Sequence, residues 1–175
     1  MMSLSKIKSA GITGFDILNQ YGNINVTLQD VTAINISATN LDFGTGTVAS
    51  GCSFCEMHTP GSTNATCCIG LAAPANGITL ENIGNTNVSL NYSFTHDSGT
   101  FIGGTDPEFN LNGSEKEVGS CNNTAGFGLF WGINLGESFA CPKFYSADAN
   151  DELYFDVQLK VPSDALSGAR NASFN

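Results

Sequence analysis

Apolar and polar residues alternate along most of this chain, which is the period of a β-strand with one buried face. The clearest run covers residues 153–161, and a second covers residues 87–95. A third run places Ile24, Val26 and Leu28 on one face, with polar residues between them. We expect each of these runs to form a half-buried antiparallel strand.

Shorter runs, separated by clusters of Gly, Asn and Pro, predict the remaining strands. They lie around Ile34–Ile36, Leu41–Phe43, Ile78–Asn82, Phe109–Asn112, Phe127–Ile133 and Phe139–Tyr145. About nine strands, with short helices only around Phe15–Asn19 and Ser163–Leu166, predict an all-β fold. The expected architecture is an antiparallel two-sheet β-sandwich, immunoglobulin-like or jelly-roll-like. Residues 1–21 are expected to form an N-terminal arm and residues 22–175 the sandwich domain.

The charge of the chain narrows its partners. Sixteen acidic and six basic residues give a formal net charge of −10. Nucleic acids and anionic lipid surfaces attract basic proteins, so both are excluded as expected partners. The longest apolar stretch, residues 126–135, is too short to span a bilayer, and we expect no membrane span.

Six cysteines fall into two groups along the chain. An even number in an exported protein predicts three disulfides, which would staple the sandwich. A zinc site formed by the four clustered cysteines is the alternative, but adjacent cysteines rarely aim at one ion. We expect the last two cysteines to pair with each other and the first four among themselves. The cysteines are Cys52, Cys55, Cys67, Cys68, Cys121 and Cys141.

Eight Asn-X-Ser/Thr acceptor sites for glycosylation crowd into the 175 residues. Chance placement of 19 Asn and 32 Ser plus Thr gives roughly three to four such triplets. The excess predicts a glycosylated, extracellular or cell-surface protein. The alternative is that Asn-rich strands are merely soluble faces. The acceptors are Asn25, Asn35, Asn64, Asn87, Asn91, Asn112, Asn122 and Asn171.

Candidate chemistry is sparse. The densest group of oxygen ligands is Asp148, Asn150, Asp151 and Glu152, which suits an irregular calcium site or a plain acidic turn. His58 lies between the clustered cysteines and is expected on the surface. The chain has no nucleophile elbow, phosphate loop or His-Glu-x-x-His motif. We therefore expect no enzyme and no cofactor apart from that calcium ion.

An aromatic-rich stretch around Trp131 allows two interpretations. The ordinary one is packing in the core beside the bridge between Cys121 and Cys141. The other is an exposed platform that stacks on sugar rings, which would make the protein a glycan-binding or adhesive module. Exposure of the Trp131 indole distinguishes the two interpretations.

Three stretches resemble secreted archaeal and bacterial immunoglobulin-like domains. They are Asn40–Val48 (NLDFGTGTV), Ile78–Asn91 (ITLENIGNTNVSLN) and Asp156–Gly168 (DVQLKVPSDALSG). Together with an N-terminal arm, this pattern resembles the sandwich subunits of the TasA and camelysin class and of related archaeal surface filaments. The cysteine cluster departs from that class.

The resemblance implies a non-catalytic structural subunit of an extracellular filament, tube or layer. Copies of the chain would assemble by lending a strand to the next subunit, like a pilus built by donor strand complementation. The strand would come from the arm, whose apolar residues are Ile7, Ile12, Phe15 and Ile17. We also expect a short final strand, with Ala172 and Phe174 facing inward. It is too short to cover the edge of the sandwich beside the strand Leu153–Val161, so that edge is expected to be left uncovered.

Overall fold

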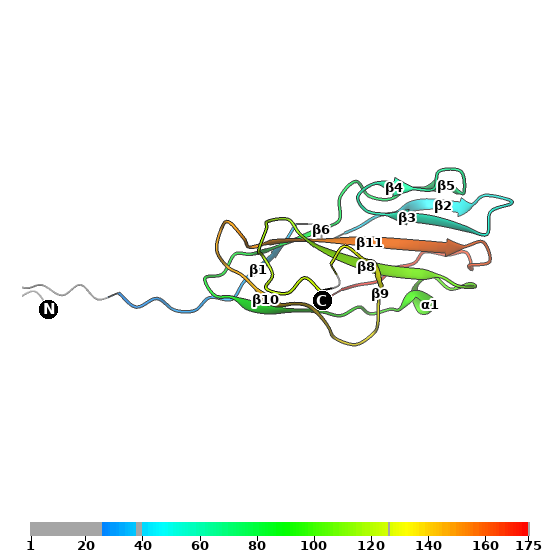
Figure 1. Ribbon diagram of the computed structural model, residues 1–175. Coiled ribbons are helices and arrows are strands. Elements are labelled where there is room, and N and C mark those ends of the chain that lie inside the picture. The colour runs from blue at the N-terminus through cyan, green and yellow to red at the C-terminus, as the bar shows by residue number, and fades with distance from the viewer. Residues whose placement is uncertain (1–25, 38–39, 126, 175) are drawn as a thin grey trace, which may run out of the picture.

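A seven-stranded antiparallel sheet, centred on the last strand, forms the larger layer of the molecule (Figure 1). The computed structural model describes residues 26–37, 40–125 and 127–174. β8 pairs along one side of β11, whereas β6 and β3 follow each other along its other side. The strands are β1 (Ile34–Ile36), β3 (Phe54–His58), β4 (Ser62–Thr63), β6 (Ile78–Asn82), β8 (Glu108–Glu115), β9 (Trp131–Gly132) and β11 (Glu152–Pro162).

A second layer covers part of this sheet. It consists of β7 (Val88–Tyr92) paired with β10 (Ser138–Phe144), and the single-turn helix α1 (Ser98–Phe101) follows β7. A separate pair, β2 (Gly44–Val48) and β5 (Cys68–Leu71), lies beside β3 and β4 at the opposite side of the sheet (Figure 1). The described residues thus form eleven strands and one short helix.

The alternation in the sequence places the core between the layers. Leu153, Phe155, Val157 and Leu159 of β11 are at most 5% exposed, and polar side chains occupy the positions between them. Phe144 from β10 is fully buried against this face. The predicted all-β, antiparallel, disulfide-stapled fold is therefore confirmed, with more strands than the nine expected.

All six cysteines form disulfides, as predicted. Cys121 is joined to Cys141, so the bridge ties the segment after β8 to β10. The clustered cysteines pair as Cys52–Cys67 and Cys55–Cys68. These two bridges fasten the β2–β5 pair to the start of β3, and they take the place of the zinc site considered as an alternative.

Several predicted elements differ from the structure. Residues 41–43 are not a strand, because pairing begins only at Gly44. In place of the helix predicted over residues 163–166, Ser163 and Asp164 form a turn, in which Asp164 accepts hydrogen bonds from Thr105. The predicted strand 127–133 shrinks to the two residues of β9. The expected helix at residues 15–19 lies outside the described residues.

Candidate functional site

An apolar groove opens between the two layers, where β1 and β6 face β7. It encloses about 210 Å³. Eleven of its twelve lining residues are apolar or aromatic, and the lining comes from six strands, from Phe94 just after β7 and from the C-terminal segment. The lining residues are Ile34, Ile36, Ile78, Leu80, Leu90, Asn91, Tyr92, Phe94, Leu111, Ala140, Phe155 and Phe174.

Both strands at the mouth of the groove have an edge without a partner strand among the described residues. β1 pairs only with β6, and β7 pairs only with β10. The other edge of each strand presents backbone N–H and C=O groups next to apolar side chains, which is the arrangement that accepts an added strand. The sequence placed an uncovered edge beside the strand at residues 153–161. This placement is wrong, because β11 has paired strands on both sides and the open edges belong to β1 and β7.

The C-terminal segment closes one end of the groove. Phe174 forms an antiparallel bridge with Phe94, and the Thr95 N–H donates to the Ser173 carbonyl at 2.9 Å. Ala172 and Phe174 are half-buried, while Asn171 and Ser173 are exposed, so the predicted inward and outward faces of this segment are confirmed. Among the described residues this segment pairs with Phe94 but with no residue of β7, and the side chains of Leu90 and Tyr92 still line the open part of the groove.

The N-terminal segment of the described chain leaves the domain instead of joining a sheet (Figure 1). Val26 and Leu28 are 81% and 82% exposed. The prediction that they belong to a half-buried strand is therefore wrong within this chain, because no described strand lies beside them. Ile24 and the predicted assembly residues Ile7, Ile12, Phe15 and Ile17 lie outside the described residues.

Asn85 fixes the direction in which this segment departs. The Val31 N–H donates to the Asn85 side-chain oxygen at 2.7 Å, and the Asn85 N–H donates to the Val31 carbonyl at 3.0 Å. The Asn85 side-chain amide also donates to the Gln29 carbonyl at 2.8 Å. Residues 29–31 are thus held against the β6–β7 connection, just before β1 begins. The sequence did not indicate this clamp, because an Asn that holds a distant segment cannot be distinguished in sequence from an Asn that only forms a turn.

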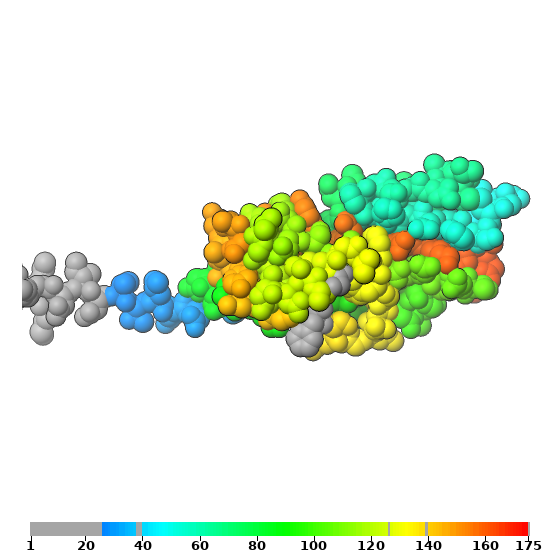
Figure 2. Space-filling view, viewed as in Figure 1, coloured from blue at the N-terminus to red at the C-terminus, as the bar shows by residue number. Residues whose placement is uncertain are grey.

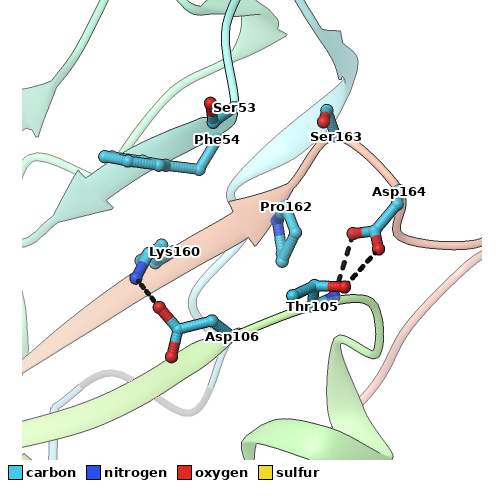
Figure 3. A pocket seen from close by; sticks show the side chains of 8 residues that line it. All are labelled: Ser53, Phe54, Thr105, Asp106, Lys160, Pro162, Ser163 and Asp164. Carbon is cyan, nitrogen blue, oxygen red and sulfur yellow. Dashed lines mark hydrogen bonds and ion pairs between the residues drawn. The ribbon is translucent and has the colours of Figure 1, made fainter.

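A second hollow, of about 500 Å³, lies at the end of β11 (Figure 3). Lys160 crosses its floor, and its ammonium group contacts Asp106 at 2.8 Å and Glu108 at 2.9 Å. These hydrogen bonds raise the pKa of Lys160. Hydrogen bonds from the side chain and backbone of Thr105 lower the pKa of Asp164. Lys160 therefore stays protonated and Asp164 stays ionised around neutral pH, and the one ammonium group faces the carboxylates of Asp106 and Glu108.

One aromatic ring borders this hollow. Phe54 is 36% exposed, and the Lys160 ammonium lies 5.2 Å from its ring centroid. The hydroxyl groups of Ser53 and Ser163 complete the rim (Figure 3). A ring beside hydroxyl and carboxylate oxygens suits a neutral, polar ligand with one apolar face.

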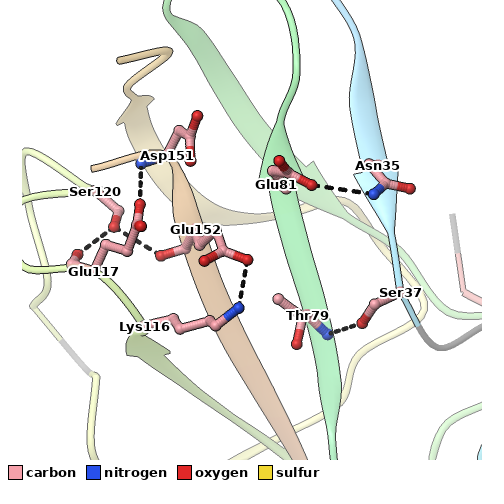
Figure 4. A network of polar contacts seen from close by, with 9 residues as sticks. All are labelled: Asn35, Ser37, Thr79, Glu81, Lys116, Glu117, Ser120, Asp151 and Glu152. Atoms are coloured by element: carbon pink, nitrogen blue, oxygen red, sulfur yellow. Dashed lines mark hydrogen bonds and ion pairs between the residues drawn. The ribbon is translucent and has the colours of Figure 1, made fainter. Parts of the chain in front are cut away.

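The acidic residues expected to bind calcium are part of a structural network (Figure 4). The Glu152 carboxylate pairs with Lys116, and the Ser120 hydroxyl donates to the Glu117 and Glu152 carbonyls. The Glu117 carboxylate accepts from the Asp151 N–H at 2.9 Å.

The predicted calcium ligands do not gather around one point. Asn150 donates to the Gly119 carbonyl, and Asp148 lies exposed in the turn before it. Across residues 26–37, 40–125 and 127–174, no group of three or more His, Cys, Asp or Glu side chains is arranged to hold a metal ion.

Six of the predicted glycosylation acceptors are exposed. Asn112 differs, because it is half-buried on β8 and its side-chain oxygen is buried without a hydrogen-bond partner among the described residues. Asn25 lies outside the described residues. The exposed acceptors are Asn35, Asn64, Asn87, Asn91, Asn122 and Asn171.

Trp131 and His58 serve packing. The half-buried Trp131 packs against the core, and its indole N–H donates to the Tyr92 hydroxyl. It is therefore not the exposed platform that a sugar-stacking role of this residue requires. His58 is half-buried, with its ring in edge contact with Phe130 at a centroid distance of 5.7 Å.

Comparisons of the chain with models of protein families, with curated proteins and with solved structures find no match. In the part of the chain that the structure describes, no helix is long and apolar enough to cross a membrane. The site itself therefore has to carry the functional argument.

Proposed function

We propose that this protein is a non-catalytic structural subunit of an extracellular filament, tube or layer, and that copies assemble by strand exchange. The observation that carries the proposal is the apolar groove bordered by the unpaired edges of β1 and β7. A strand from another subunit would cover the apolar lining and satisfy both rows of backbone groups at once.

The covalent chemistry of the chain supports an extracellular location. Three disulfides persist in oxidising compartments and are rare in the cytosol. Six exposed acceptor sites leave room for glycans on the surface. The resemblance to TasA-class and archaeal surface-filament subunits, which rests on sequence patterns alone, agrees with this location.

Electron microscopy of the purified, oxidised full chain tests the proposal. We expect filaments, tubes or sheets that grow with protein concentration, while single particles of one size at every concentration would contradict it. Intact-mass measurement on protein from the native source tests the glycan part separately. A mass equal to the bare 18.3 kDa chain would show that the acceptors are unused.

A glycan-binding or adhesive module is the second candidate, favoured by the hollow beside Phe54. Its one ammonium group is already paired with two carboxylates, and the oxygens of Asp106 and Asp164 can accept hydrogen bonds from sugar hydroxyls, so a neutral sugar with one apolar face fits it better than an anion. In this case Phe54→Ala should abolish binding on a glycan array. Tyr154→Ala is the matched control, because Tyr154 is an equally exposed aromatic residue on β11. Equal binding by both variants would exclude this hollow.

A further inference from the structure

The segment that precedes β1 has the apolar–polar alternation of a strand, yet its described apolar residues Val26 and Leu28 are largely exposed. In an extended strand, the sequence pattern puts Val26 and Leu28 on one face with Ile24. Val26 and Leu28 are each more than four-fifths exposed in the folded chain. An apolar stripe that is not buried in its own domain indicates an interaction surface when it has strand periodicity. This apolar stripe is complementary to the groove, which has apolar walls and two strand edges without a partner among the described residues.

We propose that residues 24–28 are the donor strand, and that Val26 and Leu28 insert into the β1–β7 groove of a second copy. This inference rests on the proposed function and deepens it by naming the inserted segment. It moves the donor from residues 1–21, which the sequence pattern favoured, to the only alternating run of the N-terminal region. Five residues match the length of β7, along whose free edge they would pair.

The Asn85 clamp explains why the acceptor is another copy. To enter its own groove, the segment would have to reverse direction immediately before β1. Residues 29–31 are instead held by three hydrogen bonds to Asn85 and lead away from the domain (Figure 1). Extended chain covers about 3.3 Å per residue, so residues 24–28 would reach roughly 17 Å beyond the clamp when fully extended.

Charge favours contact between the N-terminal region and a domain over contact between two domains. Residues 1–25 carry Lys6, Lys8 and Asp16, a formal net charge of +1, so the rest of the chain carries −11. Two such acidic domains repel each other, whereas the N-terminal region, with an uncharged donor at residues 24–28 and weakly basic residues before it, meets no such repulsion. The space-filling view shows the described part of this segment as a narrow projection clear of the domain (Figure 2).

Three double variants of the full chain, produced without glycans, test the inference. Each adds two carboxylates: V26D/L28D on the apolar stripe, T27D/Q29D on the opposite face, and I12D/I17D in the earlier part of the arm. The first two pairs lie on exposed residues, so thermal unfolding of the monomer should not change. Polymer formation is measured by sedimentation and electron microscopy across a range of concentrations.

We expect V26D/L28D to raise the critical concentration for polymer formation at least about 100-fold, because two apolar side chains lose their burial. T27D/Q29D and I12D/I17D should polymerise within a few-fold of the unmodified chain. If V26D/L28D polymerises normally, the inference is wrong while the proposed function stands. If the unmodified chain itself never polymerises, both are wrong.

A competing peptide gives a second readout on the unmodified chain. A synthetic peptide of residues 20–30 should shorten the polymers as its concentration rises, since it fills the groove without offering a domain. The same peptide with Ile24, Val26 and Leu28 replaced by Ser should have no effect. Equal effects of the two peptides would overturn the assignment of the donor residues.

Discussion

β11 and β7 carry the same alternation of apolar and polar residues, yet the structure surrounds them differently. β11 has paired strands on both sides, and Leu153, Phe155 and Val157 are almost fully buried. Within the part of the chain that the structure describes, β7 has a partner only in β10, and its inward residues Leu90 and Tyr92 stay half-buried along the groove. A strand that is satisfied within the chain serves stability, whereas one with an open edge and an exposed apolar wall is free to serve binding.

The largest expected effect is on the free energy of unfolding, when one leucine of β11 and one leucine of β7 are each replaced by alanine. Leu153→Ala removes a side chain with no exposed surface and should lower the free energy of unfolding by about 2–5 kcal/mol. Leu90→Ala, in the half-buried wall of the groove, should cost about half as much in the monomer or less. Urea titration of both variants under oxidising conditions measures the difference. Equal losses would mean that the groove wall is as well packed as the centre of the large sheet.

The periodic strands were predictable from sequence because their partners lie in the same chain. Alternation located β7, β8 and β11, since burial on one face imposes a period of two. It failed at Val26 and Leu28, where the same pattern has no partner within the described chain. Alternation predicts that one face of a segment is buried, but it does not identify the segment or molecule that buries it.

The glycine-rich pair β2–β5 escaped prediction for a different reason. The glycine cluster at Gly44 and Gly46 predicts a turn between strands, yet both residues lie in β2, paired with β5. A Cβ on Gly46 would lie 2.0 Å from the Ile69 carbonyl oxygen, so only glycine allows this close approach of the two backbones. The disulfides were predictable from the count of cysteines, whereas their pairing within the first group required the structure.

Removal of the bridge beside the second layer is expected to have the next largest effect. C121S/C141S opens a loop with a sequence separation of 20 residues, which should cost about 3 kcal/mol in the chain-entropy estimate. Because Cys141 lies in β10, the loss should loosen the support of β7 more than that of β11. Hydrogen exchange resolved by peptide measures this effect. We expect the variant to exchange faster than the unmodified chain, with a larger increase in β7 and β10 than in β11. Uniform acceleration throughout the chain would contradict it.

A buried amide joins the two regions. Asn82, at the end of β6, is 1% exposed, and its side chain donates to the Thr86 carbonyl and to the Phe144 carbonyl in β10. Asn82→Ala removes the buried side-chain donor that these two carbonyls share and should cost about 1–3 kcal/mol in chemical unfolding. Asn85→Ala is the control, because Asn85 is exposed and its bonds hold only the N-terminal segment. A loss from Asn85→Ala as large as that from Asn82→Ala would show that the clamp, not the buried amide, joins the layers.

The smallest effect concerns a carboxyl group at the start of β11. Asp151 is 8% exposed, and burial raises its pKa, helped by the nearby Glu117 and Glu81 carboxylates. The folded state therefore binds this proton more tightly than the unfolded chain, in which the pKa of Asp151 is near 3.8. Ionisation of Asp151 therefore destabilises the fold. This penalty is complete above the raised pKa and disappears as the pH falls through that pKa to below 3.8. Asp151→Asn keeps the backbone N–H that donates to Glu117 and removes the charge.

We expect Asp151→Asn to be more stable than the unmodified chain at pH 7, with a gain that shrinks steadily toward pH 3.5. Urea midpoints at pH 7, 5 and 3.5 measure this gain. Asp30→Asn makes the same change of charge at an exposed position in the N-terminal segment and should have no such pH-dependent effect. A gain that grows on acidification would mean that the folded chain stabilises the ionised form of Asp151. The network at this end of β11 would then bind its charge instead of merely tolerating it.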